Sequence, residues 1–328
     1  GAMATRRLTP EAIQRGLAAL VEFREAADSL GVDDITCAAT SAVREAENGV
    51  EFCKAVKEHT GIHVRVIAGK DEGRLIHLGA RNHLDFSQGR VLLADLGGGS
   101  TEFVLCDPET ALVTLSEPVG HIRATDELVT GSPLGSKDAS AVKQWAKKRL
   151  EKLTARIRGE DFATLVGTSG TIRCLARMAT HMRGQIPPEH GDGMVLHLDE
   201  LDALLKIFKT TPAEDLDKLQ GMDSRRVRTL PAGAVIVRTI LRALDKKEMR
   251  TSVYALRDGL VLDWINKHRP EIAVGATEAD PRRRTVMGVM KRYGVHRRHA
   301  QHVARLALQI FDATAELHGL RIDDRRTL

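Results

Sequence analysis

RVLLADLGGGSTEFVLC, residues Arg90 to Cys106, is the stretch of sequence that decides the fold. Its two apolar runs, Arg90–Ala94 and Phe103–Cys106, predict a pair of strands joined by a glycine-rich turn. Because glycine has no Cβ, such a turn can bring its backbone amides against a phosphate. A tight hairpin without a ligand is the alternative when the triple glycine is taken alone. The amides concerned are those of Gly97, Gly98, Gly99 and Ser100.

A second glycine-containing loop, GTSGT at Gly167–Thr171, lies between the apolar pair Leu165-Val166 and a helical pattern over Ile172–Met182. The free amides and the dipole at a helix N-terminus favour anions. Two such loops in one chain therefore predict a phosphate-binding cleft. The phosphate-binding residues expected in this loop are Thr168, Ser169 and Gly170.

The flanking sequence alternates between strand and helix patterns, which predicts an α/β fold with a partly parallel sheet. On the N-terminal side the patterns predict a helix from Pro10 to Gly31, a strand at Ile35–Ala39, a helix at Val50–His59 and a strand at Ile62–Val66. On the C-terminal side they predict helices at Asp138–Arg158, Asp199–Thr210 and Ala232–Leu244.

Composition narrows the class of protein. Of the 328 residues 42% are hydrophobic and 28% charged, with 49 Lys and Arg against 44 Asp and Glu, which is typical of a globular protein. Only 3% are aromatic, so the stacking platforms of single-stranded nucleic-acid binders are not expected. No window reaches the ~18 apolar residues of a membrane span. We therefore expect neither a nucleic acid nor a membrane as partner.

The four cysteines form no CxxC pair, which predicts neither a zinc site nor a disulfide framework and favours a cytoplasmic location. They are Cys37, Cys53, Cys106 and Cys174. The chain also contains no GxxxxGK[ST] motif and no GxGxxG motif opening a helix, which argues against a P-loop and against a dinucleotide-binding fold. Paired phosphate loops across a cleft are typical of the actin-like superfamily.

Six motifs together carry a family resemblance. They are TSAVR at 40–44, GKDEGRLI at 69–76, DLGGGSTE at 95–102, GTSGT at 167–171, PAGA at 231–234 and ALRDG at 255–259. In this order, over nearly the whole chain, they resemble the exopolyphosphatase and guanosine pentaphosphate phosphohydrolase family.

The resemblance implies two actin-like, ribonuclease-H-like α/β lobes with a cleft between them, followed by an α-helical C-terminal segment. The first lobe would cover residues 1–78, the second 79–268, and a linker with the start of a helical HD-like domain 269–328. The family opens with a strand and an Asp-x-Gly-Ser-Asn-type phosphate loop, which this sequence lacks, so we expect the parent protein to be longer. His299 matches the first histidine of the HD-like domain, and no metal site is predicted there.

The resemblance also implies roles for four side chains. Glu72 matches the catalytic general base, and its alternative is a solvated acid at a helix start. Arg44 matches a phosphate-binding arginine, and its alternative is a surface ion pair with Glu45 or Glu47. Asp95 and Glu102 match acidic residues that would hold Mg2+ or the nucleophilic water, so Glu102 counts as both catalytic and metal-binding. The alternative interpretation of Asp95 is an aspartate that caps the turn. The alternative interpretation of Glu102 is an exposed strand residue.

The implied activity is release of terminal phosphate from inorganic polyphosphate or of the 5' phosphate from guanosine pentaphosphate, with Mg2+ or another divalent cation as cofactor and a homodimer as the assembly. A noncatalytic phosphate- or alarmone-binding module, or an inactive truncated fragment, is the alternative. An actin-like ATPase or sugar kinase is a third hypothesis. Basic residues cluster at Arg225, Arg226 and Arg228 and again at Arg282–Arg284. A solvated helix face is the favoured interpretation of these clusters, and guidance of a long polyanion toward the cleft is the alternative.

Overall fold

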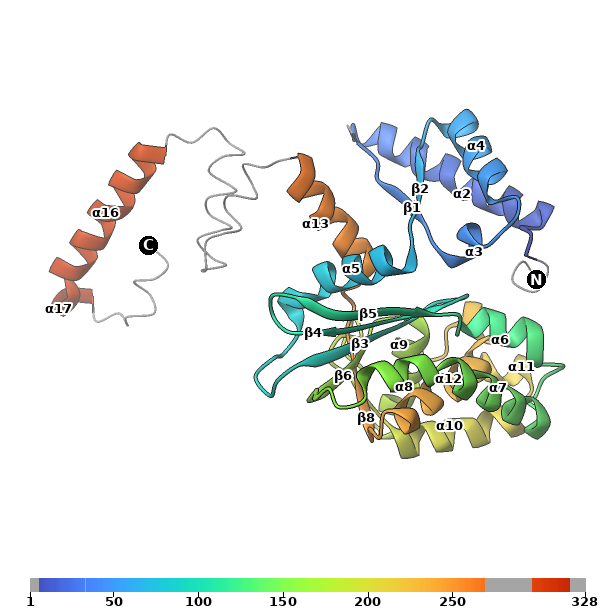
Figure 1. Cartoon of the computed structure of the whole chain (residues 1–328). Helices are drawn as coiled ribbons and strands as arrows, with labels where there is room; N and C mark the ends of the chain where they lie inside the picture. Colours follow the sequence, from blue (N-terminus) through green and yellow to red (C-terminus); the bar gives the residue numbers. More distant parts are fainter. Residues whose placement is uncertain (1–5, 33, 269–296, 319–328) are drawn as a thin grey trace. The chain divides into compact units, whose positions relative to one another are not determined.

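The computed structural model of the chain describes residues 6–32, 34–268 and 297–318. These residues belong to two compact units, 1–263 and 264–328. The first unit holds both sheets (Figure 1). The second holds the helices α16 (Arg297–Ala313) and α17 (Ala315–His318), and the end of α13 (Leu256–His268).

The N-terminal part of the first unit is built on a two-stranded parallel sheet. Its elements are α2 (Pro10–Ser29), β1 (Cys37–Ala39), α3 (Ser41–Arg44), α4 (Gly49–Thr60) and β2 (Val64–Val66). The predicted helices and strands are present, but both strands are shorter than the apolar patterns indicated. Ile62 is buried without belonging to β2, because an apolar residue can pack beside a sheet without joining its hydrogen-bond ladder.

A six-stranded sheet forms the larger part of the first unit. Its order is β5-β4-β3-β6-β8-β7, and its strands are β3 (Val91–Leu96), β4 (Thr101–Cys106), β5 (Ala111–Glu117), β6 (Thr164–Gly167), β7 (Val195–His197) and β8 (Glu248–Thr251). β6 is parallel to β3 and to β8, and the other pairs are antiparallel. The partly parallel sheet is thus confirmed. Together, the small and large sheets and their helices form the α/β fold expected from the sequence.

Alternate residues of β3 and β4 enter two cores on opposite faces of the sheet. Leu92 and Phe103 belong to the larger core, with the helices that follow β5. These are α6 (His121–Leu128), α7 (Ser136–Arg149), α8 (Glu151–Ile157), α9 (Gly170–Met182), α10 (Leu198–Thr210), α11 (Ala213–Leu216) and α12 (Leu230–Ala243). The single helical stretch predicted at 138–158 is in fact two helices, α7 and α8.

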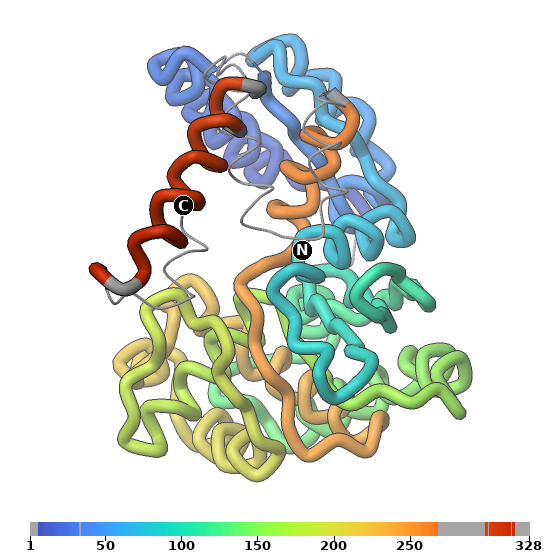
Figure 2. The backbone as a smooth tube through the Cα atoms, turned by 90° about the vertical axis from the view of Figure 1, so that its left-hand side faces the viewer, coloured from blue at the N-terminus to red at the C-terminus, as the bar shows by residue number. Residues whose placement is uncertain are grey.

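The opposite face of the sheet is covered by α5 (Gly69–Ala80). Its Ile76 packs with Leu93 and Val104 in the smaller core. Two glycines let α5 approach closely, since a Cβ on Gly69 would lie 2.4 Å from Ser116 Cβ and one on Gly73 2.4 Å from Thr114 Cγ2. In Figure 2 the chain rises from the sheet into α13 beside α5.

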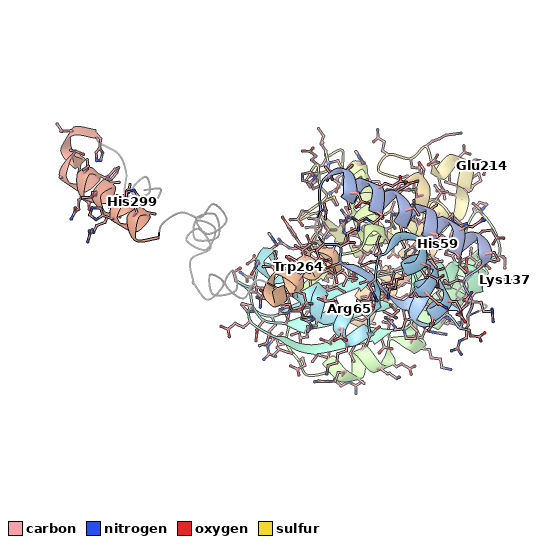
Figure 3. All side chains as sticks on the ribbon, turned by 90° about the horizontal axis from the view of Figure 1, so that it is seen from above. His59, Arg65, Lys137, Glu214, Trp264 and His299 are labelled. Carbon is pink, nitrogen blue, oxygen red and sulfur yellow. The ribbon has the colours of Figure 1, made fainter. Side chains whose placement is uncertain are left out.

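In the second unit, α16 carries three exposed apolar side chains, those of Val303, Leu306 and Ile310. His299 lies near the start of this helix (Figure 3). Of the predicted linker and HD-like segment at 269–328, residues 269–296 and 319–328 lie outside the described residues. Among the described residues no helix is long and apolar enough to cross a bilayer.

Candidate active site

Asp95 and Glu102 are register partners in the antiparallel pair β3–β4, and Ser116 of β5 is the next partner of Glu102. The turn is therefore shorter than the sequence suggested, because the ladder extends through both acids. Glu102 is only 2% exposed, so the alternative of an exposed strand residue is wrong. Its Oε1 accepts hydrogen bonds from Ser100 Oγ at 2.7 Å and Ser116 Oγ at 2.8 Å.

α5 brings Glu72 over the same face of the sheet. Glu72 lies in the first turn of α5 and is 6% exposed, so it is not a solvated acid. Arg44 Nη1 lies 3.3 Å from Glu72 Oε2 and donates to the Ile67 carbonyl at 2.7 Å. Glu45 and Glu47 form ion pairs with other arginines, which overturns the alternative of a surface pair for Arg44.

The three carboxyl groups share one poorly hydrated space. Burial, reinforced by the charge of Glu72, raises the pKa of Glu102 to about 8. Burial also raises the pKa of Asp95 to about 6. The pKa of Glu72 is raised by burial as well, although the hydrogen bond and charge of Arg44 oppose this shift. Such a group of acids takes up protons or binds a cation more readily than isolated carboxylates do.

The glycine-rich turn points its carbonyls toward α6. Amides in the first turn of α6 donate to the carbonyls of Gly97 and Gly98 at 3.0 to 3.1 Å, and Arg123 Nε donates to that of Gly99 at 2.9 Å. The Gly97 amide, which we expected to bind phosphate, instead donates to the carbonyls of Asp95 at 3.1 Å and Ser100 at 2.9 Å. Within the described part of the chain, the amides of Gly98 and Gly99 donate to no protein acceptor. They remain available for a ligand, as a phosphate loop requires.

The second loop reaches the same edge of the sheet, because β3 and β6 run parallel and Ala94 is opposite Gly167. Ser169 is the N-cap of α9 and accepts the amide of Ile172 at 3.1 Å. Thr168 lowers the pKa of Asp95, against the effect of burial. The structure thus joins both predicted phosphate loops to the carboxyl groups.

A cavity of about 480 Å³ opens at the start of α9. Its lining includes four arginines, Arg173, Arg177, Arg225 and Arg226. Arg226 Nη1 donates to Thr171 Oγ1 at 3.3 Å, and the charge of Arg173 lowers the pKa of Asp95. The cavity therefore adjoins the acidic site. Sequence reasoning noted Arg225 and Arg226 but missed Arg173 and Arg177, whose spacing of four residues places them on one face of a helix.

Among residues 6–32, 34–268 and 297–318, no group of three or more His, Cys, Asp or Glu side chains is arranged to enclose a metal ion. Asp95 and Glu102 nevertheless supply two neighbouring carboxyl groups. This donor set fits Mg2+, which binds through one or two carboxylates and completes its shell with water and substrate phosphate.

Comparison with known proteins shows the family of the chain. Residues 1–268 match the family model of the Ppx/GppA phosphatase family. The chain is 31% identical to "Exopolyphosphatase 1" of Mycobacterium leprae over 83% of this chain and 80% of the relative. It is 30% identical to the protein of that name from Mycobacterium tuberculosis over 78% and 74%.

Two solved structures are also similar. An exopolyphosphatase from Cytophaga hutchinsonii has a TM-score of 0.73 and 26% identity, covering 80% of this chain and 86% of that one. The Aquifex aeolicus PPX-GPPA enzyme has a TM-score of 0.63 and 28% identity, covering 80% and 87%. With the family model matched over most of its length, this chain belongs to the Ppx/GppA phosphatase family.

Proposed function

We propose that this protein hydrolyses the terminal phosphoanhydride bond of inorganic polyphosphate and releases orthophosphate. The observation that carries the proposal is the Arg44–Glu72 ion pair, which faces buried Glu102 beside two phosphate loops. The relatives named exopolyphosphatase support polyphosphate as the substrate. Guanosine pentaphosphate, losing its 5' phosphate, is the second candidate, because it presents the same terminal anhydride.

Glu72 is the proposed general base. Its carboxylate takes a proton from a water molecule, the water oxygen bonds to the terminal phosphorus, and the bridging P–O bond breaks toward the remaining chain. Arg44 provides a guanidinium for the phosphate oxygens. The amides of Gly98 and Gly99 are positioned to donate to the transferring group. A divalent cation held by Asp95 and Glu102 would supply further neutralisation of phosphate charge.

The arginine-lined cavity extends the proposed binding site beyond one phosphate. A linear polyanion needs cations along its length, and Arg173, Arg177, Arg225 and Arg226 supply them next to the reacting end. This supports a substrate with several consecutive phosphates. We infer a homodimer and a cytoplasmic location from the family resemblance and the cysteine pattern, and light scattering on the purified chain tests the first of these.

The test is orthophosphate release by the purified chain, its length verified by intact mass, in Mg2+ with long-chain polyphosphate or guanosine pentaphosphate. We expect release from polyphosphate, and its loss in Glu72→Gln. Release from guanosine pentaphosphate alone would reassign the substrate. Binding of both without turnover would instead support a phosphate- or alarmone-binding module.

A further inference from the structure

Arg123 makes two contacts that the proposed reaction does not use. It lies in the first turn of α6 and its side chain is only 11% exposed. Nε donates to the Gly99 carbonyl at 2.9 Å, and Nη2 donates to Glu45 Oε2 at 2.6 Å. One guanidinium therefore joins the glycine-rich turn to a residue 78 positions earlier in the chain.

Glu45 directly follows Arg44 and is the C-cap of α3. Its second carboxylate oxygen accepts a hydrogen bond from Ser41 Oγ at 2.6 Å, and Ser41 is itself buried. Both oxygens of Glu45 are thus engaged, which orients the carboxylate toward Arg123. Because α3 has only four residues, its own hydrogen bonds cannot hold it rigidly, and contacts with the rest of the fold must do so.

We propose that Arg123 is a positioning residue, which sets the spacing between Arg44 and the glycine-rich turn so that both bind the same phosphate group. This inference rests on the proposed function. The planar guanidinium suits the role because it donates in two fixed directions at once, one to a carbonyl and one to a carboxylate. Arg123 itself donates to protein acceptors and does not need to contact the substrate.

A double-mutant cycle on ligand binding tests this coupling. Tripolyphosphate binding is measured by calorimetry in Glu72→Gln, where turnover is not expected. Arg44→Ala is then introduced with and without Arg123→Gln. We expect Arg44→Ala to weaken binding about tenfold when Arg123 is present and less than about threefold when it is replaced. The same loss in both backgrounds would overturn the proposal.

Two further variants control for folding. Glu45→Gln weakens the contact between Glu45 and Arg123 by changing its acceptor. It should therefore reduce the effect of Arg44→Ala on binding, as Arg123→Gln does. This variant keeps the test valid if Arg123→Gln folds poorly. Arg90→Gln removes an ion pair with Glu160 at the opposite end of β3 and should leave the affinity unchanged. An equal loss in Arg90→Gln would mean that the effect of Arg123 is general destabilisation.

Orthophosphate release by the unmodified chain is measured in parallel and keeps the two proposals apart. Absence of release together with coupled binding would reject the hydrolase and retain the positioning role for ligand binding. Orthophosphate release without coupling between Arg44 and Arg123 in binding would reject only the positioning role of Arg123. If tripolyphosphate does not bind at all, the positioning role is overturned.

Discussion

Asp95 and Glu102 lie opposite each other in the β3–β4 ladder, with both side chains on the sheet face covered by α5. Their pKa values are raised to about 6 and about 8, because burial disfavours the charged forms. Like-charged groups directly opposite each other in a sheet destabilise it. The pair is therefore costly for the fold, which is typical of residues retained for a function.

Glu102→Gln should stabilise the metal-free protein at alkaline pH. The pKa of Glu102 is about 8 in the folded state against an ordinary 4.5, so between these values the folded state binds more protons than the unfolded state. Unfolding free energy then falls as pH rises through this window. Glutamine does not ionise and therefore avoids this loss. We expect the unfolding free energy of Glu102→Gln to exceed that of the unmodified chain by about 1 kcal/mol or more at pH 8, and to differ little at pH 4.5.

Thermal unfolding in a chelating buffer measures this difference. Glu214→Gln is the control, because Glu214 is exposed on α11 (Figure 3). An identical pH dependence of melting in Glu102→Gln and the unmodified chain would contradict the raised pKa. Added Mg2+ should narrow the gap between the two proteins at pH 8, since a cation relieves the same repulsion.

Glu72→Gln should lower kcat by at least about 100-fold while changing KM only a few-fold, because the amide keeps the shape but cannot accept the proton. Steady-state orthophosphate release measures both constants. Glu51→Gln, on the exposed side of α4, should behave like the unmodified chain. Retention of normal turnover in Glu72→Gln would remove Glu72 as the base.

Arg44→Leu should move the acidic limb of the pH profile of kcat/KM to higher pH. Arg44 lowers the pKa of Glu72 through its hydrogen bond and its charge, against the effect of burial. Without the guanidinium, the base should lose its proton only at higher pH. The profile separates this effect from weaker phosphate binding, which would lower kcat/KM at every pH without moving the limb. An unmoved limb would show that another group controls it.

Gly73→Ala should destabilise the protein by about 1–3 kcal/mol and reduce turnover, because the new Cβ pushes α5 and Glu72 away from the sheet. Thr114→Ser removes the methyl group that the Cβ would meet at 2.4 Å, so the double variant should recover part of both losses. Gly131→Ala is the matched control, since its Cβ would have no neighbour within 4 Å. Full activity in Gly73→Ala would contradict the close approach of α5.

Arg177→Gln should raise KM for long-chain polyphosphate at least about threefold and leave KM for tripolyphosphate nearly unchanged, because the arginine-lined cavity serves phosphates beyond the reacting end. The difference should shrink at high salt. Lys137→Gln, an exposed cation on α7 (Figure 3), provides the comparison. An equal rise in KM for both substrates would place Arg177 at the terminal phosphate instead.

Much of the fold follows from local sequence patterns. The sequence predicts the strands around the glycine-rich turn and the helix after the second loop. These elements depend on the spacing of apolar residues and on capping residues such as Ser169. The lengths of β1 and β2 could not, since pairing with a partner strand decides where a ladder ends. The break between α7 and α8 at Leu150 also lacks a glycine or proline signal.

The sequence by itself determined the α/β class, the positions of the two glycine-containing loops and the family, because these depend on residues that are neighbours along the chain. Only the tertiary structure decided that Glu72 lies against Arg44, that Glu102 is buried between two serine hydroxyls, and that Arg123 joins Glu45 to Gly99. The reason is physical. These contacts depend on strand register and on how closely α5 and α6 pack, and both are set by burial of apolar surface across the whole unit.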